Sequence, residues 1–157
     1  MSELPPPPPP PTGEGNRLGT VGQRALALVL DNIILGVPVV ALFLILGVDF
    51  TNTNDSAFFA ITVVQLVVSL VYNTAMIATS GATVGKRIMR LRVVNRVDGS
   101  SVSWSYAAVR ALVPTVAGLI PVVGFALNIA VYVRAFFHPY RQGLHDAAAG
   151  TIVVRRD

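Results

Sequence analysis

The chain has 157 residues, of which 53% are apolar and 13% are charged, and it carries a formal net charge of +4. An ordinary soluble domain has roughly 25% charged residues, so this composition indicates a membrane protein. Cysteine is absent, which excludes a disulfide framework and a thiolate metal site. The basic charge does not indicate nucleic-acid binding where the basic residues border membrane segments.

The N-terminal segment contains two acids and seven consecutive prolines before any apolar run. A signal peptide needs a positive region leading directly into an apolar one, so we expect none here. The segment instead predicts a disordered cytoplasmic tail over residues 1–20, with polyproline II character. The tail is either a passive spacer or a ligand for an aromatic groove.

Two apolar stretches, Ala25–Leu46 and Ala57–Thr79, are long enough to cross a bilayer, because a spanning helix needs about 20 residues. The polar segment 47–56 between them has no Lys or Arg, whereas a basic cluster follows the second stretch. Basic residues close to membrane segments stay in the cytoplasm, so we expect both termini inside and segment 47–56 outside. We also expect the cluster to attract anionic lipid headgroups of the inner leaflet. Its members are Lys86, Arg87, Arg90 and Arg92.

The third apolar stretch, residues 106–137, is interrupted near its centre by prolines and glycines. Proline removes a backbone hydrogen bond and kinks or breaks a helix. A helical hairpin that turns near Gly118–Pro121 would return the C-terminus to the cytoplasm, as the basic residues require. One kinked crossing is the alternative.

The cytoplasmic segments carry strand signals. Asp98–Gly99 is a strong turn signal between two segments with β character, which predicts a hairpin over residues 90–104. A short helix over 144–149, ended by Gly150, precedes a third strand over 151–156. The predicted fold is an all-α integral membrane protein with two full transmembrane helices, a broken helical hairpin and a small cytoplasmic β-sheet, over residues 21–157.

Asp31 interrupts the first apolar stretch, and an ionised carboxylate in lipid costs at least about 2.5–3.5 kcal/mol unless it is satisfied. Arg24 shares its helix face but lies about 10 Å away along the axis. A polar stripe on the second helix offers a partner, and we expect Asp31 near Asn73. This polar layer is a packing lock, a proton- or ion-handling site, or a contact for lipid or protein. Its other predicted members are Asn32, Gln65, Ser69, Arg110 and Arg134.

No motif indicates an enzyme. The segment "GATVGKR" lacks the spacing and the Ser or Thr of a phosphate-binding loop. His138 and His145 have no second ligand at metal-binding spacing, and no serine occupies a nucleophile elbow. We therefore expect no catalytic residue, metal or cofactor.

Three segments resemble the motifs of RDD domain membrane proteins, which are named for one Arg and two Asp. They are "GQRALALVLDNIIL", "GATVGKRIMRLRVVNRVDG" and "RQGLHDAAAGTIVV", in the family's order from Leu18 to Val154. The resemblance assigns the three named positions to Arg24, Asp31 and Asp146. It implies a membrane location, whereas the family's role is largely undefined, with cation/proton antiport proposed for some members. The proline-rich tail also resembles that of actinobacterial proline-rich antigens.

These observations predict an accessory or scaffold subunit, or an assembly factor, in the plasma membrane. The alternative is a small oligomeric transporter, similar to a cation/proton antiporter, that uses Arg24, Asp31 and Asp146. We expect contacts with the bilayer and with other membrane proteins or further copies of the chain, and none with nucleic acid. We also expect Asp146 to lie at the inner surface and to pair with Arg24 or Arg110.

Overall fold

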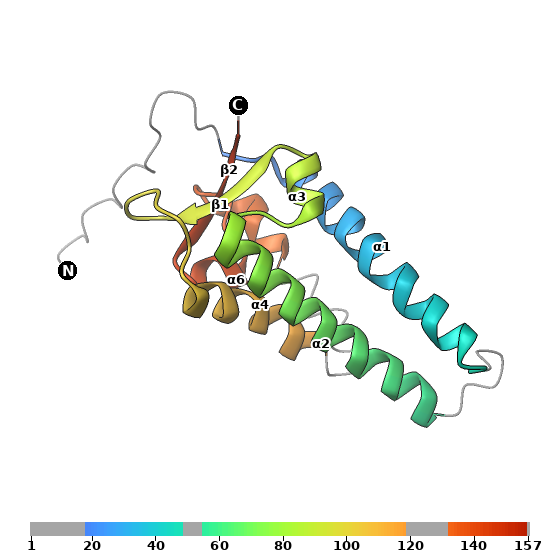
Figure 1. Ribbon diagram of the computed structural model, residues 1–157. Helices are drawn as coiled ribbons and strands as arrows, with labels where there is room; N and C mark the ends of the chain where they lie inside the picture. Colours follow the sequence, from blue (N-terminus) through green and yellow to red (C-terminus); the bar gives the residue numbers. More distant parts are fainter. Residues whose placement is uncertain (1–17, 49–54, 119–131, 157) are drawn as a thin grey trace.

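The computed structural model describes residues 18–48, 55–118 and 132–156. Long helices run side by side away from one end of the molecule, where the strands and the short helices gather (Figure 1). The elements are α1 (Val21–Ile45), α2 (Asp55–Ser80), α3 (Val84–Ile88), β1 (Leu91–Asn95), α4 (Trp104–Gly118), α6 (Leu144–Ala148) and β2 (Thr151–Arg155). Residues 132–137 are also helical.

The described part of the chain begins at Leu18, within the predicted tail of residues 1–20. Leu18 forms an isolated β-bridge with Val154, and Thr20 caps α1. The Thr20 hydroxyl accepts a 3.2 Å hydrogen bond from the Gln23 backbone, and the Gln23 side chain accepts one from the Thr20 backbone. This capping box satisfies two donors that a helix N-terminus otherwise leaves free. The predicted tail otherwise falls in residues 1–17, outside the described residues.

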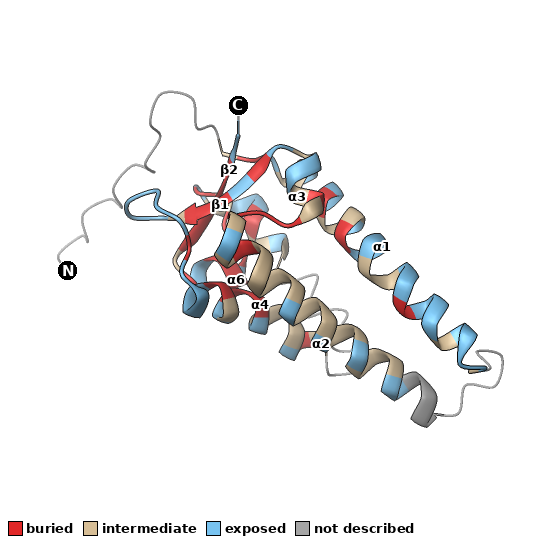
Figure 2. Cartoon of the chain, in the orientation of Figure 1, coloured by how far each residue is buried: buried red, intermediate tan, exposed pale blue. Residues whose placement is uncertain are grey.

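α1 and α2 are long and apolar enough to cross a membrane by length and composition. At 1.5 Å per residue they measure about 37 and 39 Å, more than the hydrocarbon core of about 30 Å. Their shafts carry exposed or half-buried apolar side chains, and burial is concentrated at the sheet end (Figure 2). Only 11% of the apolar window of α1 and 6% of that of α2 are buried, unlike the core helix of a soluble protein.

In the described residues the sheet has two strands, and the hairpin predicted over residues 90–104 is wrong. β1 pairs antiparallel with β2, and Val93 lies opposite Val153. The turn after β1 does form, with Gly99 at φ 70°, but the chain then enters α4 instead of returning as a strand. Val102, in the segment between this turn and α4, packs into the hydrophobic core. One edge of β1 is therefore paired with β2, a strand about 60 residues later in the sequence.

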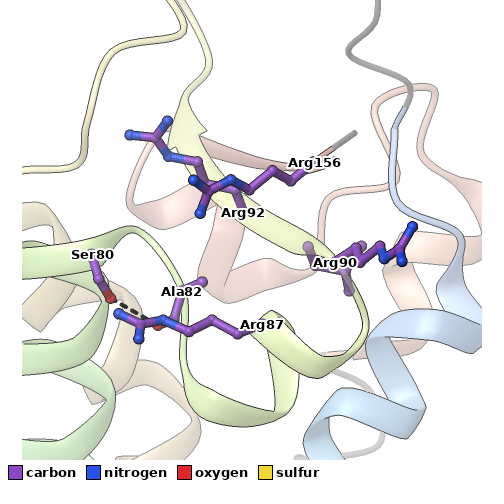
Figure 3. A pocket seen from close by; sticks show the side chains of 7 residues that line it. Ser80, Ala82, Arg87, Arg90, Arg92 and Arg156 are labelled. Atoms are coloured by element: carbon purple, nitrogen blue, oxygen red, sulfur yellow. Dashed lines mark hydrogen bonds between the residues drawn. The ribbon is translucent and has the colours of Figure 1, made fainter.

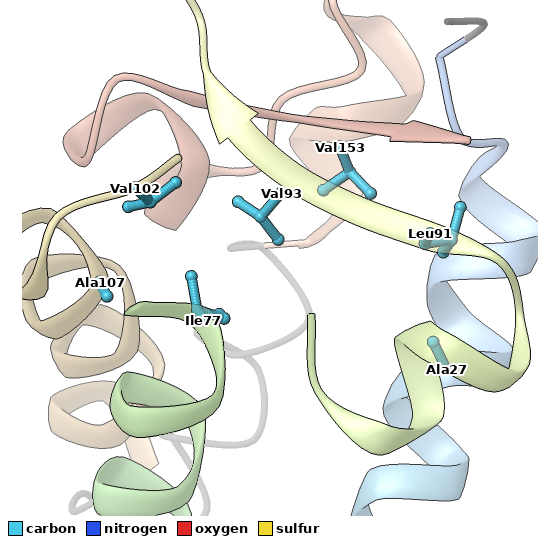
Figure 4. Packing of buried hydrophobic residues seen from close by; sticks show 7 residues of the cluster. All are labelled: Ala27, Ile77, Leu91, Val93, Val102, Ala107 and Val153. Carbon is cyan, nitrogen blue, oxygen red and sulfur yellow. The ribbon is translucent and has the colours of Figure 1, made fainter. Parts of the chain in front are cut away.

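The hydrophobic core lies beneath the sheet and joins both strands to α1, α2 and α4 (Figure 4). It packs valines of both strands against the ends of the long helices. Its buried members are Ala27, Ile77, Leu91, Val93, Val102, Ala107 and Val153. Burial of apolar side chains thus holds together one end of the molecule, and the helix shafts beyond it stay uncovered.

The third apolar stretch brings both of its described arms to α6. Arg110, in α4, forms an ion pair with Asp146, and the ring of Tyr132 lies 4.8 Å from that of His145. Since His145 and Asp146 are neighbours, the two arms meet at the same end of the molecule. This arrangement favours the helical hairpin over one kinked crossing, although residues 119–131 lie outside the described residues.

Candidate functional site

The Asp31 carboxylate is buried, with 4% of the residue exposed, and three groups donate hydrogen bonds to it. The Tyr72 hydroxyl and the Gly85 backbone N–H reach Oδ1 at 2.9 and 2.8 Å. The Thr83 hydroxyl reaches Oδ2 at 2.6 Å. A carboxylate that accepts several hydrogen bonds can stay ionised inside a protein. These contacts join α1 to α2 and to the start of α3.

The N-terminus of α3 supplies two of the three donors, the Thr83 hydroxyl and the Gly85 N–H. The Gly85 N–H is free to donate because the first N–H groups of a helix have no partner within the helix. Thr83 is the N-cap residue, and the Val84 N–H donates to the Tyr72 hydroxyl at 2.8 Å. The Tyr72 hydroxyl in turn donates to the Asp31 carboxylate, so Tyr72 links the Val84 N–H to Asp31. Gly85 can approach this closely because it has no Cβ, which would lie 2.2 Å from the Ala27 carbonyl oxygen. The segment rejected as a phosphate-binding loop thus binds an anion after all, namely a carboxylate of the same chain.

Lys86 points into this cluster and not toward the surface. Its Nζ lies 3.8 Å from Oδ2 of Asp31 and 3.2 Å from the Thr83 hydroxyl. Burial, together with the nearby Arg110, lowers the pKa of Lys86 to about 8, although Asp31 and Asp146 act in the opposite direction. Lys86 therefore faces inward beside Asp31, whereas the other members of the predicted lipid-facing cluster, Arg87, Arg90 and Arg92, are exposed.

A second cluster surrounds Asp146, which is fully buried. Arg24 Nη1 lies 3.1 Å from Oδ2, the Gly143 N–H donates to the same oxygen at 3.1 Å, and Arg110 pairs with Oδ1. Burial alone would raise the pKa of Asp146, but Arg110, His145 and Arg24 outweigh it and lower the pKa to about 2. The predicted pairing of Asp146 with Arg24 or Arg110 is confirmed, and both arginines take part.

The Asp146 cluster ties α1, α4, α6 and β2 together. Arg24 also donates to the carbonyl oxygen of Val153 at 3.3 Å. Arg110 donates to the Thr151 hydroxyl at 2.8 Å, and Gln142 donates to the Thr151 carbonyl oxygen at 2.8 Å. Breaking one partner of such a network leaves a buried charge uncompensated.

His145 borders the same carboxylate. Its Nε2 lies 3.6 Å from Oδ1 of Asp146, and its ring packs against Tyr132. Burial lowers the pKa of His145 to about 4, against the opposing effect of Asp146. The imidazole is therefore neutral at pH 7, and the two arginines carry the positive charge of the cluster.

The predicted polar layer is partly wrong. The Asn73 amide donates to the Ser69 carbonyl oxygen at 2.9 Å, and the hydrogen bonds to Asp31 come from other residues. Asn32 is exposed, because consecutive residues of a helix are turned by about 100° and its side chain leaves the face that buries Asp31. Gln65 and Arg134 are half-buried and contact neither carboxylate in the described residues.

Sequence reasoning missed Thr83, Gly85 and Thr151 as partners. Thr83 could have been found as a helix cap, because Thr is a preferred N-cap residue. The other two contacts had no such signal, since a backbone N–H and a strand hydroxyl do not appear in a helical polar stripe.

These features define a mostly helical protein with two helices that could span a membrane, held at one end by an arginine and two buried aspartates. The chain belongs to the RDD family: the model of that family matches residues 18–150, most of the sequence. Searches of curated proteins and of solved structures gave no match. In the structure the three residues that the sequence resemblance assigns to the named positions form two clusters, with Arg24 on Asp146 and Asp31 on the α3 N-terminus.

Proposed function

We propose that this RDD family chain is a multi-pass protein of the plasma membrane that acts as an accessory or scaffold subunit. α1 and α2 would cross the bilayer, and the sheet, α3 and α6 would lie at the cytoplasmic side with both termini. The exposed apolar surface of the two shafts supports this placement, because soluble proteins rarely expose large contiguous apolar areas. Lipid or the helices of partner membrane proteins would cover that surface.

The observation that carries the accessory role is the fixed environment of both motif carboxylates. Ionisable groups that conduct protons or ions in membranes face a water-filled cavity or a pathway between helices. Asp31 instead accepts hydrogen bonds from three groups at 2.6–2.9 Å, and Asp146 is held between Arg24 and Arg110. Contacts of this kind favour a structural lock between segments distant in sequence.

Ion transport through Arg24, Asp31 and Asp146 is the competing function, and one variant separates the two. Asp31→Asn removes the charge and keeps the shape of the side chain. The Thr83 hydroxyl, which now donates to Oδ2, can rotate and accept from an Asn amide, so the variant retains a route to folding.

The experiment reconstitutes the full chain and its Asp31→Asn variant in vesicles and follows pH-driven Na⁺ and K⁺ flux. The same preparations, in mild detergent, are tested for co-purifying membrane proteins. The accessory role predicts no flux from the parent and the same co-purifying proteins with both chains. Flux in the parent that disappears in a folded Asp31→Asn variant would establish the transporter instead.

A further inference from the structure

A pocket of about 700 Å³ lies where α3, β1 and the chain after β2 meet, and arginines dominate its lining (Figure 3). Arg87 comes from α3, Arg92 from β1 and Arg156 from the residue after β2. In Figure 3 these three side chains extend to the same side of the strand, whereas Arg90 points the other way. Three guanidinium groups from separate elements therefore share one pocket.

The backbone fixes these elements relative to one another. The Arg156 N–H donates to the Arg90 carbonyl oxygen at 2.7 Å, and the Val93 N–H donates to the Gly81 carbonyl oxygen at 2.7 Å. A Cβ on Gly81 would lie 3.0 Å from Nε of Arg92, so the Arg92 side chain packs closely over this glycine. The pocket is thus held by the sheet and by the turn after α2.

The charges in the pocket are not neutralised within the described residues. Among the described residues the ion pairs are those of Asp31 and Asp146, which lie outside the pocket lining, and none of them includes Arg87, Arg92 or Arg156. Arg24 and Arg110, by contrast, both form ion pairs with Asp146. Like charges brought together without counter-ions create a positive potential that attracts an external anion.

We infer that this pocket binds an anion that carries phosphate groups. The planar guanidinium fork matches the geometry of phosphate oxygens, and arginine is favoured for this recognition. The pocket volume falls within the range of about 300–1,000 Å³ typical of small-molecule sites, so it suits a phosphorylated molecule better than a single ion. The inference goes beyond the accessory role, which requires no small ligand.

The phosphate has two chemical sources. Ser80 lines the pocket and is the last residue of α2, so the site lies at the end of a helix proposed to cross the bilayer. An anionic phospholipid headgroup could reach it from the inner leaflet. A soluble phosphorylated molecule would reach it from the cytoplasm with the same contacts.

The test uses the full chain in detergent with two probes. Native mass spectrometry measures retention of phosphatidylglycerol, and calorimetry measures binding of pyrophosphate. The double variant R92Q/R156Q removes two pocket charges. R96Q/R155Q is the matched control, because it removes two charges from exposed neighbours that do not line the pocket.

We expect R92Q/R156Q to weaken binding at least tenfold for one probe and R96Q/R155Q to weaken it less than twofold. If R92Q/R156Q weakens the binding of phosphatidylglycerol alone, the natural ligand is a lipid headgroup. If it weakens the binding of pyrophosphate alone, the natural ligand is a soluble phosphorylated molecule. Equal losses in both double variants, or no binding of either probe to the parent, would overturn the inference. If R92Q/R156Q does not fold, Arg87→Gln against Arg96→Gln makes the same comparison.

Discussion

The backbone N–H of Gly85 donates a 2.8 Å hydrogen bond to the carboxylate of Asp31, 54 residues earlier in the chain. The contact requires α3 to lie backbone against backbone on α1, since a Cβ at Gly85 would come within 2.2 Å of the Ala27 carbonyl oxygen. A single missing side chain thus permits the attachment of α3 to α1.

Gly85→Ala is therefore expected to destabilise the protein strongly. Overpacking of this kind costs about 1–3 kcal/mol, and displacement of α3 would also weaken the hydrogen bonds to Asp31. Thermal unfolding in detergent measures the change. Gly36→Ala is the control, because nothing lies within 4 Å of its added Cβ and alanine favours a helix by about 0.5–1 kcal/mol. Equal stability of the two variants would contradict the close approach.

Asp146→Ala should cost about 3–5 kcal/mol, because it leaves Arg24 and Arg110 without their buried counter-ion. Double-mutant cycles with Arg24→Ala and with Arg110→Ala should both show coupling, since each arginine contacts the same carboxylate. A third cycle, of Asp146→Ala with Arg134→Ala, is the control and should show no coupling, because the ion pairs of Asp146 in the described residues do not include Arg134. Fully additive losses with both Arg24 and Arg110 would refute the shared ion pair.

Stability should fall as the pH is lowered from 6.5 to 4. The pKa of His145 is 6.5 in an ordinary environment and about 4 in the folded protein, because burial disfavours the imidazolium. Within this window the unfolded chain binds the additional proton, so acidification favours unfolding, by an amount of the order of 3 kcal/mol. Melting temperatures in detergent between pH 4 and 7.5 follow this loss.

His145→Phe is the matched variant, since it keeps a ring against Tyr132 and cannot titrate. Its melting temperature should vary less between pH 6.5 and 4 than that of the parent. Asp146 affects stability only at lower pH. Its pKa falls from 3.8 to about 2 on folding, so its stabilisation of the folded protein is complete above pH 3.8 and is lost as the pH falls below that value. An unchanged pH profile in His145→Phe would exclude His145 as the source of the acid sensitivity.

Arg90 lies between α3 and β1 with φ 54°, a conformation that glycine adopts more easily than other residues. Arg90→Gly should therefore raise the free energy of unfolding, by about 1 kcal/mol. Arg92→Gly should lower it by about 0.5–1 kcal/mol, because β1 holds Arg92 in an extended strand. Denaturant titration compares the two variants, and a loss of stability in Arg90→Gly would show that its side chain outweighs the backbone strain.

The proposed topology places segment 47–56 outside the cell and the turn after β1 inside. The chain has no cysteine, so Thr53→Cys and Ser100→Cys each introduce one thiol. An impermeant thiol reagent applied to intact cells should label Thr53→Cys alone, and both variants should react after lysis. Labelling of Ser100→Cys alone in intact cells would reverse the orientation.

Elements with a local signal could be predicted from the sequence. The apolar runs predict α1 and α2 because their length alone suits a membrane. Gly150, with φ 59°, ends the segment that contains α6, and the β-branched residues after it form β2. The interrupted third apolar stretch predicts two arms, and both described arms meet at α6.

Contacts between distant segments could not be predicted in the same way. The turn at Asp98–Gly99 suggests a local strand pair, but β1 pairs with β2 because that arrangement places Val93 and Val153 in the core. The partner of Asp31 was sought on the polar stripe of α2. Two of its three donors belong instead to the loop and helix around Thr83, whose approach depends on tertiary packing.

The attachment of Asp31 to α3 has a consequence for biosynthesis. Thr83 follows Asp31 by 52 residues, so α1 leaves the ribosome well before the donors to its carboxylate are made. In a chain that enters the bilayer during translation, α1 would carry an unsatisfied charge that costs about 2.5–3.5 kcal/mol. Insertion of α1 would therefore stay less favourable until α2 and α3 have been made. The Arg24–Asp146 ion pair would form last, because Asp146 follows Arg24 by 122 residues.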